Sequence, residues 1–411
     1  MGNVLAIIGE YNPFHNGHLY HLNKSLELTN SDASILILSG NFVQRGVPAF
    51  VDKWKRTTMA LKNGIDLVIE LPVLFSISSA EDFAMGAVSI LNSLKIVNYL
   101  SFGSECGDID ILNVFANILA NEPPEYKSLL QHELSKGISF PKAKENALMI
   151  YLNDIRKYSN ILNNPNNVLG IEYLKALKLT KSSIKPITIQ RQGVEHHSKK
   201  IESNYASASN IRDMLLQNRY DEVYSVVPQN TYEILMEALR SGEFIPDLKT
   251  FEKEILFVLR YMSIDEIANL PLVSEGLEHL IKDAASNCNN LDDLINHIKS
   301  KRFTQTRIQR ILLYALLGYN KSNMDFLKKN LSYIRVLGAS TRGKVLLSMI
   351  SNYNKKIEIV TSVKSFENKI IKNKPQSTLL QKDILSTDAY TLGYLKNSQS
   401  GLDYTKKLIT V

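Results

Sequence analysis

Two histidines flank a glycine in the run His15-Asn16-Gly17-His18. Imidazoles can donate hydrogen bonds to phosphate oxygens, and Gly17 leaves room for a ligand against the backbone. From Gly17 onward leucines recur at helical spacing, so a helix is predicted to begin here. The first turn of a helix carries unpaired N–H groups and the positive end of the helix dipole, which attract anions. The run therefore predicts a phosphate-binding site at a helix N-terminus.

Two other uses of these histidines compete with phosphate binding. His15, His18 and His21 recur three residues apart, which would suit zinc, but no carboxylate or cysteine in the stretch completes a ligand set. A purely structural role is also disfavoured, because imidazole rings beside a glycine at a loop tip have little hydrophobic core to pack against. We therefore predict no metal site and expect His21 to lie on the helix surface.

The elements that position this site are apolar strands alternating with helices. Apolar runs at 4–8, 33–40, 66–72, 99–102 and 184–191 are typical of buried strands, and glycine or proline turns follow them. Helical segments lie between successive runs. This alternation predicts an α/β fold with a doubly wound parallel sheet.

Polar residues and one glycine are predicted at the carboxyl edge of this sheet, where ligands collect in open α/β folds. As candidates for contacts with a base, a ribose or phosphates we take Gln44, Arg45, Gly103, Asn166, Asn167 and Arg191. Lys53 and Arg56 could also reach a triphosphate. A solvent-facing basic turn explains either of them at least as well.

A second phosphate-binding element is predicted around residue 207. Ser207 and Ser209 are suited to cap a helix, and Arg212 lies one turn inside it. Hydroxyls, free N–H groups and a guanidinium would converge there on an anion.

Together the two elements resemble the paired motifs of the nucleotidylyltransferase superfamily, H-x-G-H and I-S-S-T-x-x-R, and the Rossmann-like fold of that superfamily. Ala206 and Ala208 depart from the second motif, while Ser209 and Arg212 match it. Members of the superfamily attack the α-phosphate of a nucleoside triphosphate and expel pyrophosphate. The catalytic residues expected on this basis are His15, His18, Ser209 and Arg212.

The composition limits the number of domains and the cellular compartment that we expect. The chain has 411 residues, of which 44% are hydrophobic, enough for two or three domains. Its two cysteines are far apart in sequence, which suits a reducing cytoplasm. We expect no signal peptide, because no basic region or cleavage site precedes the first strand, and no apolar run approaches membrane-spanning length. We therefore expect a cytoplasmic protein with no membrane partner.

Positive charge is concentrated toward the end of the chain. Residues 299–411 hold 21 Lys and Arg against 6 Asp and Glu, whereas residues 1–298 hold 27 against 35. This asymmetry suits a protein that holds a polyanion at one end, although a solvated lysine-rich surface explains it equally well.

The sharpest basic segment spans residues 299–310 and leads into an apolar helix. Its cationic groups would face a nucleic-acid backbone. They belong to Lys301, Arg302, Arg307 and Arg310.

The second half of the chain differs in character from the first. Helical periodicity predominates from about 220 to 330, and short strands of a small closing α/β piece are predicted at 333–338 and 357–361. We therefore divide the chain into a nucleotidylyltransferase-like catalytic domain, 1–215, and a mainly helical, basic RNA-binding region, 216–411.

Longer blocks resemble the bacterial tRNA(Met) cytidine acetate ligase family, at residues 9–18, 38–46, 102–105, 167–173 and 302–308. In that family, acetate and ATP give acetyl-adenylate and pyrophosphate, and the acetyl group passes to N4 of the wobble cytidine of elongator tRNA(Met). The resemblance implies an ATP site made by Ile7, Ile8, Gly9, Glu10, Tyr11, Asn12, Pro13, Phe14, His15, Asn16, Gly17, His18, Leu19, Tyr20, Gly103, Asn167, Arg191 and Gln192.

This chemistry suits the residues. Acetate is already a nucleophile, so adenylation needs only in-line placement and charge neutralisation. Mg²⁺ is expected to shield the departing pyrophosphate. In the second step the anticodon base must be unstacked into the pocket, at a cost of a few kcal/mol that backbone contacts from the basic tail would offset.

Two other classes remain open. A small-molecule nucleotidylyltransferase, for instance one that makes a dinucleotide cofactor, explains the first 215 residues equally well but leaves the rest without a role. An RNA-binding protein with a vestigial fold explains the basic tail but not two phosphate-binding elements.

Overall fold

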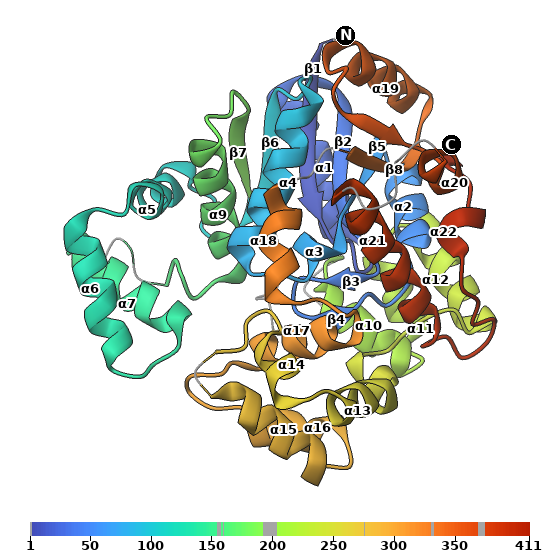
Figure 1. The fold of residues 1–411 in the computed structure, drawn as a ribbon. Helices are drawn as coiled ribbons and strands as arrows, with labels where there is room; N and C mark the ends of the chain where they lie inside the picture. The colour runs from blue at the N-terminus through green and yellow to red at the C-terminus, as the bar shows by residue number, and fades with distance from the viewer. Residues whose placement is uncertain are drawn as a thin grey trace.

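A mostly parallel sheet lies at the centre of the computed structural model, which describes residues 2–153, 158, 160–191, 204–274, 276–329, 333–368 and 375–411 (Figure 1). In spatial order its strands are β10 (Ile409–Thr410), β8 (Tyr333–Ala339), β5 (Leu67–Leu71), β2 (Ser31–Ser39), β1 (Asn3–Gly9), β6 (Tyr99–Ser104) and β7 (Lys185–Gln190), with β9 (Glu358–Val360) also paired to β8. The predicted α/β fold is confirmed. Its one antiparallel pair among the described strands of this sheet is β5 with β8, and β9 and β10 run parallel to β8.

The site of ligand binding follows from the position of β1. This strand pairs in parallel with β2 on one side and β6 on the other. The chain builds outward from β1 through β2 to β5, then returns to build β6 and β7 on the other side. The carboxyl ends of β1 and β6 therefore flank the topological switch point, where open α/β sheets bind their ligands.

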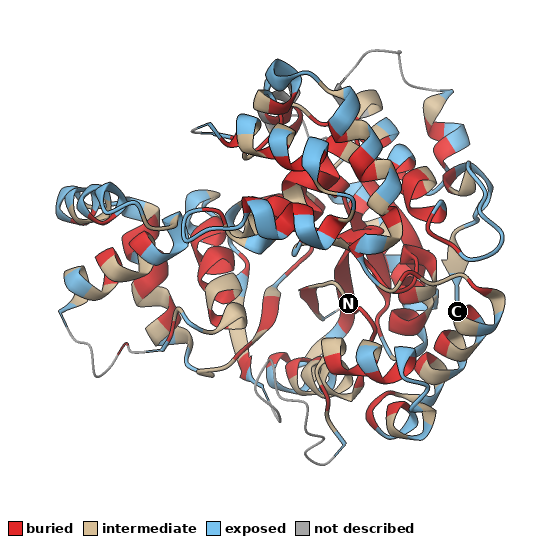
Figure 2. Cartoon of the chain, turned by 90° about the horizontal axis from the view of Figure 1, so that it is seen from below, coloured by how far each residue is buried: buried red, intermediate tan, exposed pale blue. Residues whose placement is uncertain are grey.

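Helices cover both faces of the sheet (Figure 1). Those nearest the switch point are α1 (Asn16–Thr29), α2 (Lys53–Lys62), α3 (Val73–Ser76), α4 (Ala80–Leu94) and α9 (Pro165–Leu179). Alternate residues of β1 enter two cores, because successive side chains of a strand point to opposite faces. Val4, Ala6 and Ile8 pack with α4, whereas Leu5 and Ile7 pack with α1 and α2. Figure 2 shows the resulting concentration of buried residues in the sheet and on the inner faces of the helices.

Two further groups of helices flank this centre. On one side α5 (Ile109–Asn121), α6 (Pro124–Ser135) and α7 (Phe140–Leu152) extend away from the sheet (Figure 1). The helical region predicted from about 220 to 330 contains α11 (Tyr220–Val226), α12 (Gln229–Ser241), α13 (Glu252–Tyr261), α14 (Ile264–Ala268), α15 (Leu277–Asn287), α16 (Leu291–Ile298), α17 (Gln305–Leu316) and α18 (Lys321–Lys329), and α10 (Ala208–Leu216) precedes it. Most of these helices lie below the sheet in Figure 1. None of the described helices is both long and apolar enough to cross a membrane.

The last part of the chain returns to the sheet. The strands predicted at 333–338 and 357–361 exist as β8 and β9, but they extend the main sheet instead of forming a separate small piece. The helices α19 (Thr341–Tyr353), α20 (Val363–Glu367), α21 (Pro375–Thr391) and α22 (Leu402–Thr405) accompany them. The division after residue 215 stays a prediction, and the sheet contains strands from both sides of it.

A buried group of charged side chains joins the C-terminal part of the chain to the sheet. The Lys53 ammonium lies 2.7 Å from a Glu70 oxygen and 2.9 Å from an Asp403 oxygen. Arg335 on β8 contacts the same two carboxylates, at 3.4 and 2.5 Å. Each cation faces two anions, which offsets the cost of removing these charges from water. The Lys53 side chain is 0% exposed, so neither sequence expectation for it, a triphosphate contact or a solvent-facing turn, is right.

Arg56 is fully buried as well. Its guanidinium donates to the carbonyl oxygens of Glu10 and Ser39, at 2.7 and 3.0 Å, and to that of Gly40. Both expectations for this residue are therefore wrong also, because Arg56 ties the ends of β1 and β2 together.

Candidate active site

The two histidines of the first motif cap the N-terminus of α1. His15 is the N-cap residue, and its Nδ1 accepts the backbone N–H of Gly17 over 3.1 Å. His18 Nδ1 accepts the backbone N–H of His15 over 3.3 Å. This reciprocal pair is a capping box built from imidazoles. The two rings stack with their centroids 3.7 Å apart, so the motif's spacing fixes both at the helix start.

Both imidazoles are neutral hydrogen-bond donors. Burial, with a smaller contribution from the Arg191 guanidinium, lowers the pKa of His15 to about 3. Burial, with His15 and Arg191 adding to it, holds the pKa of His18 well below its usual value. Because each Nδ1 accepts a backbone N–H, each neutral ring carries its proton on Nε2. Both rings line one cavity, so they can offer N–H groups to phosphate oxygens there.

His21 belongs to the same site, and the expectation that it lies on the helix surface is wrong. Its Nε2 lies 3.0 Å from Ser101 Oγ on β6, and its ring lines the cavity. Burial lowers its pKa to about 4. The signal was its three-residue spacing from His18, which puts both rings on one face of α1.

The lowered pKa values of these three histidines predict that the protein loses stability in mild acid. An unfolded histidine has a pKa of about 6.5, so stability is full above that value and falls as the pH approaches the lower folded pKa. Replacing His21 with Gln, which keeps a polar atom near Ser101, should reduce this loss by about 1–3 kcal/mol. Chemical denaturation at pH 7 and at pH 4.5 measures the loss. An equal loss in wild type and variant would contradict the prediction.

The second motif reaches the first through Arg212. Ser207 caps α10 through its hydroxyl, which lies 3.0 Å from that of Ser209. Arg212 extends to the Asn12 carbonyl, with 2.7 Å between Nη1 and the oxygen. Ser207, Ser209 and Arg212 line the same cavity as the histidines. The structure therefore brings together two motifs that lie about 190 residues apart in sequence.

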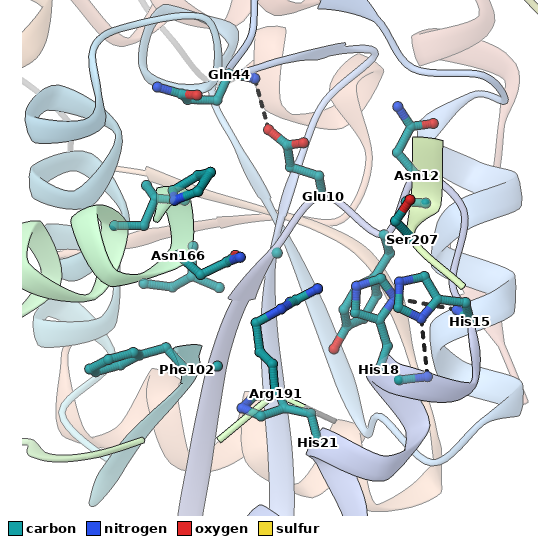
Figure 3. Close-up of a pocket in the computed structure, with 18 of the residues that line it drawn as sticks. Glu10, Asn12, His15, His18, His21, Gln44, Phe102, Asn166, Arg191 and Ser207 are labelled. Carbon is teal, nitrogen blue, oxygen red and sulfur yellow. Dashed lines mark hydrogen bonds between the residues drawn. The ribbon is translucent and has the colours of Figure 1, made fainter. Parts of the chain in front are cut away.

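The opposite wall is built by the end of β6 and the start of α9. The Asn167 amide oxygen accepts the backbone N–H of Glu105 over 2.9 Å, and the Glu105 carboxylate accepts from Asn166 Nδ2 over 2.6 Å. Gly103, Asn166 and Arg191 line the cavity, as Figure 3 shows for the last two. Asn167 does not line it and instead holds the loop after β6.

A hairpin formed by β3 (Phe42–Val43) and β4 (Val47–Pro48) closes another side of the cavity. As predicted, Gln44 and Arg45 in its turn lie at the site. The Gln44 N–H donates to Glu10 Oε1 over 2.8 Å, and the Gln44 carbonyl accepts from Arg310 Nε over 2.8 Å.

Glycine is required at the tip of this hairpin. Gly46 has a φ of +74°, and a Cβ there would lie 2.6 Å from the backbone nitrogen of Arg310. The hairpin therefore packs directly on α17, the helix that follows the basic segment.

The cavity encloses about 440 Å³, a volume typical of small-molecule sites. From the ATP site implied by resemblance, it is lined by Ile7, Ile8, Gly9, Glu10, Tyr11, Asn12, His15, Gly17, His18, Tyr20, Gly103 and Arg191. Expected residues that do not line it are Pro13, Phe14, Asn16, Leu19 and Asn167. Gln192 lies outside the described residues.

Sequence reasoning missed an apolar side of this cavity. It includes Val43, Val47, Ala80, Phe83 and Tyr173. Val43 and Val47 could have been predicted to line the site, because they flank the Gln44 turn at the carboxyl end of a strand.

The basic segment lies beside the hairpin. Lys301 and Arg302 are exposed, and α17 begins soon after them. Arg307 donates to the Leu272 carbonyl, with Nη2 2.8 Å from the oxygen, and Arg310 donates to that of Gln44. Both of these guanidinium groups therefore anchor protein loops, whatever else they contact.

The described part of the chain offers no preformed metal centre at the cavity. Among the described residues, no three His, Cys, Asp or Glu side chains are grouped so that they could hold a metal ion.

Comparison with known proteins gives consistent matches over the whole chain. A family model described as HIGH Nucleotidyl Transferase matches residues 2–404. A tRNA(Met) cytidine acetate ligase of Caldanaerobacter subterraneus is 46% identical over 407 residues, covering 99% of both chains. The protein of the same name from Clostridium perfringens is 43% identical over 399 residues, covering 95% of both.

Solved structures agree. Thermotoga maritima TmcAL bound with alpha-thio ATP is 33% identical, with a TM-score of 0.91 over 100% of both chains. The apo form of that protein matches with a TM-score of 0.94 over the same coverage.

Proposed function

The chain belongs to the tRNA(Met) cytidine acetate ligase family, and from that premise we propose that its cavity joins acetate to ATP and then acetylates tRNA. Like its relatives, it is an ATP-dependent ligase. The proposed product is N4-acetylcytidine at the wobble position of elongator tRNA(Met), with AMP and pyrophosphate released.

One observation carries this proposal. Two phosphate-binding elements, distant in sequence, line one cavity at the switch point of the sheet, and the Arg212–Asn12 contact joins them. The bound alpha-thio ATP of the Thermotoga maritima relative supports ATP as the occupant.

In the first step, an acetate oxygen attacks the α-phosphorus and pyrophosphate leaves. The chain needs no nucleophile of its own, only placement of the two reactants and donors for the charge on the phosphates. We assign these donors to the Nε2–H groups of His15 and His18, the Ser209 hydroxyl and the Arg212 guanidinium. Burial makes their hydrogen bonds stronger than they would be in water.

Mg²⁺ would accompany ATP and neutralise charge on the triphosphate. The described residues do not form a resident site for the ion. We therefore assign it no ligand from the chain and no step of its own.

In the second step, the cytidine amine attacks the acetyl carbonyl. The helical half, residues 216–411, would hold the tRNA while the target base enters the cavity. Its packing against the hairpin through Arg310 supports a direct connection between RNA binding and the reaction site. A role in tRNA modification also supports the cytoplasm as the place of action.

The decisive experiment uses labelled acetate, ATP and total tRNA. We expect label in N4-acetylcytidine after digestion of the tRNA to nucleosides, and none when ATP is omitted. A small-molecule nucleotidylyltransferase would form no labelled nucleoside. An RNA-binding protein without catalysis would bind tRNA and show no ATP–pyrophosphate exchange.

The exposed basic pair predicts how RNA binding depends on salt. Replacing Lys301 and Arg302 with Ala should weaken tRNA binding and lower the slope of log affinity against log salt by about 1.5. Acetate-dependent ATP–pyrophosphate exchange should be unchanged. The control variant replaces Lys178 and Lys181 with Ala. Both are exposed, at the C-terminal end of α9, and their loss should leave the slope of log affinity against log salt unchanged. Equal slopes for wild type and the Lys301/Arg302 variant would show that the pair contacts no phosphate.

A further inference from the structure

Glu10 is a carboxylate in a cavity that must accept anions. Among the described residues that line the cavity, it is the only Asp or Glu. ATP and acetate are both negatively charged, so a carboxylate at this place disfavours their binding. Its presence therefore points to a role other than anion binding. The adenylation step described above gives it none.

The Glu10 side chain is held in one orientation. Its Oε1 accepts the Gln44 N–H over 2.8 Å, and Gln44 is held in turn by Arg310. The Glu10 carbonyl accepts from Arg56 Nη1 over 2.7 Å, which fixes the backbone at the end of β1. Figure 3 shows the carboxylate pointing toward Gln44, away from the stacked rings of His15 and His18.

Glu10 lies between the phosphate donors and apolar residues of the cavity: burial lowers the pKa of Arg212, and the nearby Glu10 carboxylate opposes that shift. Val43 and Val47, on either side of the Gln44 turn, belong to the apolar side of the cavity. An acetyl methyl group and a flat pyrimidine would be desolvated by such residues. This end of the cavity therefore suits the acyl group and its acceptor, whereas the histidine end suits the triphosphate.

The transfer step requires a proton acceptor, and the histidines are poorly suited to be one. Both have Nδ1 occupied by a backbone N–H, so Nε2 of each neutral ring already carries a proton. Glu10 Oε1 is occupied by Gln44, which leaves Oε2 for another partner.

We propose that the Glu10 carboxylate takes the proton from the cytidine N4 amine during acetyl transfer, an assignment that rests on the proposed function. The amine lone pair forms the C–N bond to the acetyl carbon, and the bond between that carbon and the phosphate oxygen breaks, so that AMP leaves with the electron pair. The N4 proton passes to Glu10 and from there to water. The overall step converts acetyl-adenylate and cytidine into N4-acetylcytidine, AMP and a proton.

The test separates the two steps in Glu10→Gln and Glu10→Ala. Gln can still accept the Gln44 N–H but cannot take a proton, whereas Ala loses both abilities. Enzyme is first given labelled acetate and ATP, then mixed with tRNA in a single turnover. We expect transfer by Glu10→Gln to fall by about 10²- to 10⁴-fold, as general-base removal does. Its ATP–pyrophosphate exchange should be kept or raised, because loss of this negative charge favours ATP and acetate in the cavity, so the loss of rate is confined to transfer.

The alternatives give different results. If Glu10 only holds the hairpin, Glu10→Gln transfers normally and only Glu10→Ala is impaired. If Glu10 holds Mg²⁺, Glu10→Gln loses exchange and added Mg²⁺ restores it. Either result overturns the proposal. Glu27→Gln, on the exposed face of α1, is the control for loss of a carboxylate and should behave as wild type. Absence of transfer in the wild type would instead refute the proposed function itself.

Discussion

Replacing His18 with Ala is expected to lower acetate-dependent ATP–pyrophosphate exchange by about 10²- to 10³-fold, the usual effect of removing one preorganised donor from a developing anion. The reason is the fixed tautomer of His18. Its Nδ1 accepts the His15 N–H, and its Nε2–H is then available to a phosphate oxygen in the cavity that the ring lines. Binding of tRNA should be unaffected, because the change lies at the other end of the cavity from the basic segment.

A second variant distinguishes the donor from the cap. His18→Asn places an amide oxygen near the former Nδ1, so the capping interaction with His15 can persist while the donor to the cavity is lost. We expect exchange to be as low in His18→Asn as in His18→Ala. Recovery of exchange in His18→Asn would mean that His18 acts only by capping α1.

The largest effect on stability is expected at Lys53. Replacing it with Met keeps the length of the side chain but leaves Glu70 and Asp403 facing each other with only Arg335 between them. Breaking a buried pair from one side destabilises proteins by about 3–5 kcal/mol, because the remaining charge stays buried without compensation. Denaturant titration at pH 7 measures the free energy of unfolding.

Lys24→Met provides the comparison for this measurement. Lys24 pairs with Glu27 on the surface of α1, where such pairs contribute little. Its loss should change the free energy of unfolding by less than about 0.5 kcal/mol. If Lys53→Met changes the free energy of unfolding no more than Lys24→Met does, the buried charged cluster does not hold the C-terminal part of the chain on the sheet.

Local sequence patterns predicted much of the fold because they report burial directly. The apolar run that forms β1 has no polar residue to mark a wet face, and it lies between two parallel neighbours as expected. The position of Arg212 one turn into a helix likewise follows from the capping serines before it. These features depend on residues within one or two turns of each other.

The features that the sequence did not predict depend on contacts between residues far apart in the chain. Lys53 looks like a surface residue until Asp403, 350 positions later, is placed beside it. The contact between Arg310 and the Gln44 carbonyl also joins residues 266 positions apart. Likewise, β8 joins the sheet beside β5 only after more than 260 intervening residues. No local pattern encodes such pairings.

Oxygen-18 labelling tests whether acetate is activated as acetyl-adenylate in this cavity. With acetate carrying ¹⁸O in both oxygens, one labelled oxygen should appear in AMP for each N4-acetylcytidine formed, because that oxygen bridges the acetyl carbon and the α-phosphorus. The acetyl group in the tRNA should keep the other. Mass spectrometry of the AMP and of the digested tRNA reads both. Acetylated cytidine formed together with unlabelled AMP would contradict the account.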